Sequence, residues 1–334
     1  MQAKTIILFN HKGGVSKTLT TFNIAWMLSG EKGKRVLLVD CDPQCNLSAL
    51  ILREQFDDYY TNNDTKYMNI KDGVRVAFES RPEPIKAINC FNVENNKNLF
   101  LIPGHMDLSE YEPSLSLAMN SNNSMTALQN LPGALSELIR LCAEKYEIDY
   151  IFIDINPGLS AINQIAFTSA DAFIVPTNPD PFSLMALKTL LKVLPRWKQW
   201  ADNTRPFLEE ASYVLPSAKM KFIGEISQRF NRRKGKPTAS YEKTIEEIVS
   251  FVQNDFVCGL KKFGMAYDMK NYHLAEIPDF GAMLQKSNEL GVPVYALKDE
   301  ELPGGVTFEN TTAKRDEIER QFSQIADIII GTIV

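Results

Sequence analysis

A glycine-rich segment near the beginning of the chain has the residue types and spacing that bind phosphate. Directly after an apolar stretch, the sequence reads Asn10-His11-Lys12-Gly13-Gly14-Val15-Ser16-Lys17-Thr18 and then continues into a helical pattern. Successive backbone N–H groups in such a loop can cradle phosphate oxygens, and the helix that follows adds the positive end of its dipole. Lys17 would reach the β- and γ-phosphates, and the Thr18 hydroxyl would bind Mg²⁺.

The common expression for such a loop, G-x-x-x-x-G-K-[ST], is not met, because His11 and Ser16 stand where it requires glycine. The alternative is an ordinary glycine-rich turn that caps a helix. The order of strand, Gly-Gly, Lys-Thr and helix favours the phosphate loop. We therefore predict that nucleotide phosphates are bound by Gly13, Gly14, Val15, Ser16, Lys17, Thr18 and Leu19.

Three aspartates stand at the ends of apolar runs. Asp40 and Asp42 follow the run that starts at residue 35, and Asp154 closes the run at 150–153. Ligands of α/β sheets bind at the carboxyl ends of the strands, so these side chains are candidates for metal and water binding. The alternative for Asp40 and Asp42 is the N-cap of a helix over residues 46–53.

A basic window at residues 219–236 stands out from the acidic total. It holds seven Lys or Arg residues and a single acid, Glu225. Such a window can bind the phosphates of nucleic acid without reading sequence; the alternative is a solvated basic loop. We expect DNA contacts from Arg229, Arg232, Arg233, Lys234 and Lys236.

The elements that must position these residues alternate between apolar β-type runs and helical stretches. This pattern predicts an α/β fold with a mostly parallel, twisted sheet and helices on both faces. Strands are expected at 5–9, 35–40, 99–103, 150–155, 172–177 and 221–226, and helices at 17–29, 126–146, 183–202, 240–255 and 312–331.

One segment interrupts this alternation. Residues 54–97 are polar and show no clear period, so we expect an inserted, partly irregular segment.

The expected last helix, 312–331, places Ile318, Phe322, Ile325, Ala326 and Ile329 at helical spacing, which predicts that it packs on the domain. We expect one domain over residues 1–334. The first strand begins near residue 4, so we expect no preceding DNA-reading domain.

The composition sets outer limits on function. The 334 residues carry a formal net charge of −5, with 44% hydrophobic and 23% charged residues, which excludes a disordered or fibrous chain. The acidic total also argues against a wholly basic nucleic-acid module. The five cysteines form no metal-binding pattern, and there is no secretory signal or membrane span. We expect a soluble intracellular protein.

Several segments together resemble one family. Lys12-Gly13-Gly14-Val15-Ser16-Lys17-Thr18 is similar to the deviant Walker A box, K-G-G-x-G-K-[ST], of the ParA/MinD group of ATPases. Four further segments resemble the ParA (Soj-like) branch in family order: RVLLVDCDPQCN (35–46), NLFLIPGHMDLSEYE (98–112), YIFIDINPGLS (150–160) and HLAEIPDFG (273–281). Three departures are Ser16 and Cys45 in place of glycine, and Ile155-Asn156 in place of Thr-Pro after Asp154.

The resemblance implies a P-loop NTPase with ATP or ADP and Mg²⁺ as ligands. It implies catalytic roles for Lys12, Lys17 and Asp42: Lys12 would reach the partner's phosphates, and Asp42 would orient the attacking water. Mg²⁺ would be held by Thr18, Asp40 and, through water, Asp154 of the Walker B strand. Adenine would lie near Gln228, Pro278 and Asp279, for which plain turn chemistry is the alternative.

The implied function is that of a ParA-like partition ATPase. ATP would drive dimerisation into a nucleotide sandwich and non-specific DNA binding, and a ParB-like or other partner protein would stimulate slow hydrolysis and release. Such a protein would be cytoplasmic, nucleoid-associated in its ATP form and independent of membranes. Two alternatives stay open: a positioning ATPase of another bacterial system, and a nucleotide-gated interaction protein with little hydrolysis.

Overall fold

A mostly parallel sheet forms the centre of the protein. The computed structural model describes residues 3–121, 128–230, 232–233, 236–237, 239–302 and 308–333, with side chains described outside 231–240 and 303–310. Within these residues eight strands form one sheet in the order β10-β7-β6-β1-β5-β2-β4-β3, parallel except for β3 at one edge. The strands are β1 (Lys4–Leu8), β2 (Val36–Asp40), β3 (Phe91–Asn92), β4 (Leu99–Ile102), β5 (Tyr150–Asp154), β6 (Ala172–Thr177), β7 (Lys221–Phe230) and β10 (His273–Pro278).

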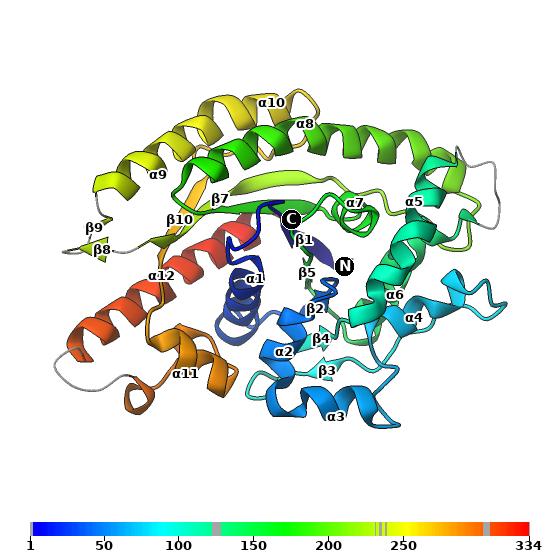
Figure 1. The fold of residues 1–334 in the computed structure, drawn as a ribbon, viewed down its shortest axis with the longest axis horizontal. Coiled ribbons are helices and arrows are strands. Elements are labelled where there is room, and N and C mark those ends of the chain that lie inside the picture. Colours follow the sequence, from blue (N-terminus) through cyan, green and yellow to red (C-terminus); the bar gives the residue numbers. More distant parts are fainter. Residues whose placement is uncertain are drawn as a thin grey trace.

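Helices follow most of the strands and return the chain to the start of the next one (Figure 1). They are α1 (Lys17–Trp26), α2 (Asn46–Leu52), α3 (Phe56–Thr61), α4 (Ile70–Phe78), α5 (Glu112–Asn120), α6 (Leu131–Lys145), α7 (Ala161–Thr168), α8 (Pro181–Thr204), α9 (Ala239–Phe251), α10 (Val257–Lys261), α11 (Met283–Leu290) and α12 (Phe308–Thr332). A short hairpin of β8 (Arg232–Arg233) and β9 (Lys236–Pro237) stands apart from the sheet.

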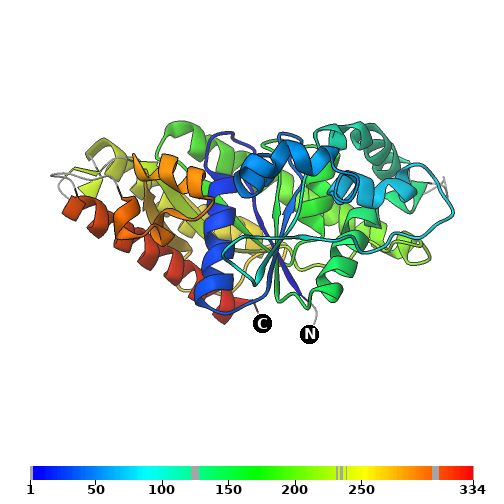
Figure 2. The ribbon, with the colours of Figure 1, turned by 90° about the horizontal axis from the view of Figure 1, so that it is seen from below.

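The sheet separates two hydrophobic cores. Successive residues of a strand point to opposite faces, so Ile6 and Leu8 join a core with α1, α11 and α12, whereas Ile7 joins a core with α4 to α9. Figures 1 and 2 show helices on both sides of the sheet. Burial on both faces explains why the parallel strands are almost continuously apolar. The predicted fold class is confirmed.

The topology brings the predicted site residues to one edge. β1 lies between β5 and β6, and β2 lies beyond β5. Because these strands are parallel, the loops that follow them all leave from the carboxyl end of the sheet. Asp40 and Asp154 are register partners across β2 and β5, which places the two carboxylates side by side at this edge.

A second polar cluster is buried in the part of the sheet that β6, β7 and β10 form. The fully buried carboxylate of Glu225 accepts hydrogen bonds from the hydroxyls of Thr177 (2.5 Å) and Ser227 (2.7 Å), and it pairs with Nδ1 of His273 at 2.7 Å. Burial opposes the charge on His273, but hydrogen bonds to Glu225 and Glu276 outweigh it and raise the pKa of His273 to about 9. Glu225, the single acid of the basic window at residues 219–236, is therefore buried in the protein interior.

The expected strands before residue 221 agree with the structure, whereas other elements differ or were not expected, among them α5, α7 and α11. β7 runs on to Phe230, four residues beyond its expected end, so Arg229 belongs to a strand. The strand β10 and the short edge strand β3 were not expected. The helix expected at 126–146 is observed over Leu131–Lys145.

The segment 54–97 contains more regular structure than its polar composition suggests. It holds α3, α4 and β3, and α4 buries Ile70, Val74 and Ala77 on one face. At the C-terminal end, α12 buries the five apolar residues named above and packs beside β10. Among the described residues, no helix combines the length and apolar character needed to cross a bilayer.

Candidate functional site

The loop between β1 and α1 is open to an anion. Gly14 has a φ of +73°, a conformation that favours glycine, and Ser16 takes the left-handed conformation with a φ of 56°. α1 begins at Lys17 without a side-chain cap and without an acidic residue in its first turn. The first N–H groups of a helix need a partner, so the uncapped start of α1 offers donors and a positive dipole end to phosphate.

Lys17 lies inside this loop rather than in solvent. Its side chain belongs to a residue that is only 7% exposed. Burial lowers the pKa of Lys17, although the nearby charges of Asp154 and Asp42 act in the opposite direction. A buried ammonium group beside uncapped helix donors is well placed to bind a phosphate anion.

Asp154 and Thr18 form a hydrogen-bonded pair beside Lys17. The Thr18 hydroxyl donates to Oδ2 of Asp154 at 2.7 Å, and the buried Oδ1 of Asp154 has no hydrogen-bond partner. Burial, and then the neighbouring Asp40, raise the pKa of Asp154 to about 8. A buried carboxylate with an unused oxygen next to a hydroxyl matches the oxygen ligands that Mg²⁺ prefers, so these residues fit the implied metal.

Asp40 is held by the start of α2. Its Oδ2 accepts hydrogen bonds from the backbone N–H (2.9 Å) and the hydroxyl (2.7 Å) of Ser48. Burial raises the pKa of Asp40 to about 6, and the bonds from Ser48 only partly offset this effect. Asp40 therefore holds α2 at the carboxyl end of the sheet, where Asp40 also lies beside Asp154.

Asp42 stands in the loop after β2. Its carboxylate accepts a hydrogen bond from the N–H of Gln44 at 2.9 Å, and its own N–H donates to Asp40 at 3.2 Å. Only 4% of the residue is exposed. These contacts fix the carboxylate at the same edge as Lys17 and Asp154.

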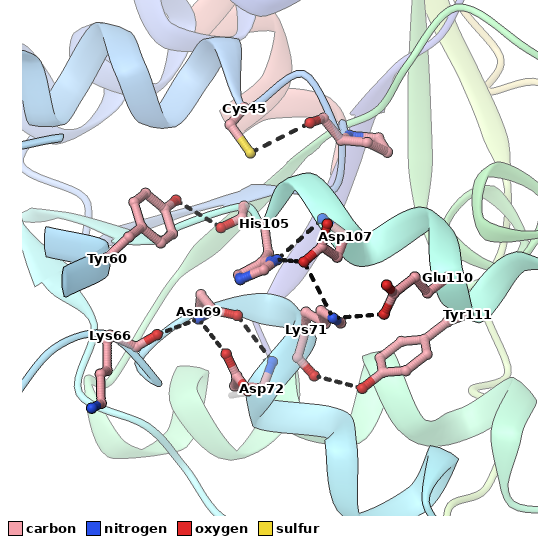
Figure 3. A network of polar contacts seen from close by, with 12 residues as sticks. Cys45, Tyr60, Lys66, Asn69, Lys71, Asp72, His105, Asp107, Glu110 and Tyr111 are labelled. Carbon is pink, nitrogen blue, oxygen red and sulfur yellow. Dashed lines mark hydrogen bonds and ion pairs between the residues drawn. The ribbon is translucent and has the colours of Figure 1, made fainter. Parts of the chain in front are cut away.

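The contacts of Asp40 continue into the segment 54–97. Gly104, which follows β4, donates its N–H to the Ser48 hydroxyl at 2.8 Å, and its carbonyl accepts a hydrogen bond from Tyr60 at 2.7 Å. Figure 3 shows Tyr60 pointing toward the loop that contains His105. A Cβ at Gly104 would lie 3.0 Å from the Asp40 carboxyl carbon. A side chain at this position would press on the Asp40 carboxyl group, so glycine favours this close approach of the chain after β4 to the site.

Lys12 does not point freely into solvent. Its ammonium group forms an ion pair with Asp180 and donates to the Ser183 hydroxyl at 3.2 Å. Asp180 also caps α8 by accepting from the N–H of Ser183 at 2.9 Å. The predicted trans-acting lysine is thus held within its own chain in this structure.

Two further side chains hold the loop from the β6–β7 side. The carbonyl of Gly14 accepts hydrogen bonds from Nδ2 of Asn178 (3.1 Å) and from the guanidinium of Arg229 (3.2 Å). Arg229, which we expected to contact DNA, therefore lies against the phosphate loop.

A cleft of about 790 Å³ adjoins Thr18. Its walls come from the start of α1, from α2 and from α11, with Leu19, Asn46, Leu50, Arg53, Leu284 and Asn288 among the lining residues. This volume is typical of a nucleotide-sized ligand site.

The three expected adenine residues do not line this cleft. Gln228 is buried under α1, where its Oε1 accepts from the Thr20 hydroxyl at 2.7 Å. Pro278 ends β10, and Asp279 closes the turn to Gly281 with a hydrogen bond of 2.8 Å. Their adenine role stays a prediction.

The remaining basic residues lie on the β8–β9 hairpin. Arg232 and Lys236 belong to paired strands, as does Arg233, but their side chains and all of Lys234 lie outside the described residues. The hairpin directly follows β7, whose last residues contact the phosphate loop.

Sequence reasoning missed the residues that follow β6. Asn178, Asp180 and Ser183 all contact Gly14 or Lys12. The available signal was their position directly after an apolar strand, the same rule that identified Asp42 and Asp154.

Comparisons with known proteins identify the family of this chain. A family model described as an AAA domain (AAA_31) matches residues 3–206. The sporulation initiation inhibitor protein Soj of Bacillus subtilis is 29% identical over 235 residues, which cover 68% of this chain and 80% of Soj. The virulence plasmid ParA family protein pGP5-D of Chlamydia trachomatis is 29% identical over 197 residues, or 57% of this chain and 62% of pGP5-D. The chain thus spans less than two thirds of pGP5-D.

A solved structure adds evidence on the fold. A variant of McdA from Cyanothece in complex with ATP has a TM-score of 0.58 with 16% identity, over 99% of this chain and 97% of that chain. Because the family model matches more than half of the chain, this protein belongs to the AAA_31 family and, within it, to the ParA and Soj-like group of deviant Walker A ATPases.

Proposed function

We propose that this protein is a ParA-like ATPase that binds ATP with Mg²⁺, dimerises around two nucleotides and hydrolyses ATP slowly when a partner protein stimulates it. The dimer would bind DNA without sequence preference and act in plasmid or chromosome partition or in cargo positioning. It would work in the cytoplasm, on the nucleoid in its ATP form. The observation that carries the proposal is the buried Lys17 between the uncapped start of α1 and the unsatisfied Asp154.

Different residues of the site would bind the phosphates, orient the water and hold the metal in phosphoryl transfer to water. The loop N–H groups and Lys17 would hold the β- and γ-phosphates, and Asp42 would orient the water. Thr18 and Asp154, with Asp40 in support, would hold Mg²⁺, which neutralises phosphate charge when bound. The cleft between α2 and α11 would take the nucleoside.

The surface around the loop supports pairing of two copies. Leu159 after β5 and two residues near the start of α8, Phe182 and Met185, are apolar yet 46%, 68% and 63% exposed. Exposed apolar groups near a functional loop are typical of an interaction face. Lys12 lies at the same edge and would neutralise the partner's γ-phosphate once released from Asp180.

Light scattering with an Asp42→Ala variant tests the dimer. We expect ATP, but not ADP, to convert this variant into a stable dimer that releases no phosphate. A monomer in ATP for both the variant and the wild type would contradict the sandwich. Dimerisation of the wild type without any phosphate release under stimulation would instead favour a nucleotide-gated interaction protein.

The DNA step has its own test. Changing Arg232, Arg233 and Lys234 to Glu should remove DNA binding in ATP while dimerisation survives. Wild-type binding should weaken with salt by a log–log slope of about −0.9 per phosphate neutralised. A matched control makes the same charge change at exposed residues elsewhere: Lys86, Lys97 and Lys262. If the hairpin variant still shifts DNA at low salt, the hairpin is only a solvated basic loop.

A further inference from the structure

The start of α7 is capped by a carboxylate from a different helix. Both oxygens of Glu112, the first residue of α5, accept hydrogen bonds from α7: one from the N–H of Ala161 and the other from the N–H of Ile162 at 3.1 Å. The Ser160 hydroxyl accepts from the N–H of Asn163 at 3.2 Å. The free donors of the first turn of α7 are thus met by two side chains, one of them charged.

The loop between Asp154 and α7 is held from its other side by Asn163. This fully buried amide donates from Nδ2 to the carbonyl of Asn156 (3.0 Å), to its side-chain oxygen (2.9 Å) and to the carbonyl of Gly158 (3.0 Å). These three hydrogen bonds tie the loop to the first turn of α7.

This loop lies against the phosphate loop. A Cβ built at Gly13 would lie 3.7 Å from the ring of Pro157, so the two loops are close neighbours with room for little more than a methyl group between them. The loop starts directly after Asp154, whose Oδ2 accepts from Thr18. A shift of the first turn of α7 would consequently move the backbone that adjoins Asp154 and Gly13.

Glu112 is itself fixed by contacts that lead to α4. The turn of helix before it, Met106–Tyr111, is tied to α4 because Lys71 pairs with Glu110 at 2.8 Å and with Asp107 at 3.7 Å (Figure 3). The ring of Tyr111 also stacks on Phe78 with 3.9 Å between centroids. Glu112 thus connects the segment 54–97 to the first turn of α7 and, through it, to the loop that follows Asp154.

We propose that Glu112 is a positioning residue for ATP hydrolysis, which acts by fixing the first turn of α7 and, through it, the loop that follows Asp154. The proposal rests on the ATPase function proposed above. Glu112 touches no reacting group. Its effect should be specific for ATP over ADP, because the loop adjoins Gly13 and Asp154, where the proposed function places Mg²⁺ and the third phosphate.

A Glu112→Gln variant tests the proposal. The amide keeps one acceptor for α7 but turns an NH₂ group toward the other N–H, and it removes the charge. We expect kcat for ATP hydrolysis to fall about tenfold, as the loss of one charge-assisted hydrogen bond implies. The Kd for ADP, measured by calorimetry, should stay within about twofold of the wild type.

The matched control is Glu144→Gln in α6, whose carboxylate contacts Arg140 and is 64% exposed. It should leave kcat unchanged. A milder variant, Ser160→Ala, removes the other cap of the same turn and should lower kcat in the same direction without loss of fold.

The outcomes separate the two proposals. A wild type that neither binds nor hydrolyses ATP overturns the ATPase function itself. With an active wild type, unchanged kcat in both Glu112→Gln and Ser160→Ala overturns the positioning role. An equal loss of ADP binding and turnover in both variants also overturns it, because a general structural role would then explain the effect. A selective loss of turnover supports it.

Discussion

Replacing Asp180 by Asn should make the protein dimerise more readily in ATP. In the free chain Lys12 pairs with Asp180. In the proposed dimer Lys12 would reach the partner's phosphate, so this ion pair would first have to open. The substitution is conservative for the fold, because the oxygen of the introduced amide can still accept from the N–H of Ser183 and cap α8, while the NH₂ group replaces the oxygen that faces Lys12.

The size of the effect follows from the exposure of the pair. The side chains of Lys12 and Asp180 are 21% and 31% exposed, so the pair is partly screened by solvent and contributes about 1 kcal/mol. A symmetric dimer opens two such pairs, which corresponds to about 2 kcal/mol and about a 30-fold larger dimerisation constant.

Sedimentation velocity over a protein concentration series, with a non-hydrolysable ATP analogue, measures this constant. The variant should remain a monomer in ADP. A Lys12→Ala variant and the double variant complete the cycle, and Asp180→Asn should have no effect on dimerisation when Lys12 is absent. An unchanged or weaker dimer, or the same gain without Lys12, would refute the reasoning.

Three further predictions concern binding and stability. Lys17→Ala should weaken ATP binding by about 100-fold or more, because no other buried cation faces the phosphates among the described residues of the loop, and calorimetry measures this directly. The pKa of His273 rises from 6.5 in the unfolded chain to about 9. Its protonation therefore contributes up to about 3 kcal/mol to the free energy of unfolding, and this contribution is complete below pH 6.5 and is lost as the pH rises through 9. Urea unfolding of the wild type should show this decline, and His273→Gln should flatten it. Gly133→Ala should destabilise the fold by about 3 kcal/mol or more in the same assay, because its Cβ would lie 1.9 Å from the Tyr213 carbonyl oxygen, and Ala134→Gly in the same helix is the control.

The sequence predicts the parts of the fold that depend on local pattern. Continuous apolar strands such as β2 and β5 and the Gly-Gly-Lys-Thr loop are visible without tertiary information, because burial on both faces and phosphate binding each restrict residue type. β10 was missed because His273 and Glu276 interrupt its apolar run, and its partner for the histidine, Glu225, is distant in sequence. α4 was missed although Ile70, Val74 and Ala77 recur at helical spacing, since the surrounding polar residues hid the period.

In the candidate site, too, residues at strand ends could be predicted from the sequence, whereas contacts between distant segments could not. Lys17, Thr18 and Asp154 are brought together by strand order, which the resemblance already implied. The pairing of Lys12 with Asp180 depends on how the start of α8 meets the phosphate loop, 168 residues away in sequence. No local pattern specifies such a contact, and the placement of Gln228 beneath α1 is of the same kind.

The left-handed backbone at Cys45 has an evolutionary consequence. Like Ser16, Cys45 precedes a helix with a positive φ, here 52°, and a side chain other than glycine in this conformation costs about 1 kcal/mol. Every cysteine codon becomes a glycine codon by a single base change, so relief of this strain is always one mutation away. Burial, and then Asp40 and Asp42, raise the pKa of the Cys45 thiol to about 12, so the thiol stays protonated. We therefore expect Cys45→Gly to relieve the backbone strain and to lose the packing of the sulfur beside Gly104, and saturation mutagenesis of this codon would show which side chains the position accepts.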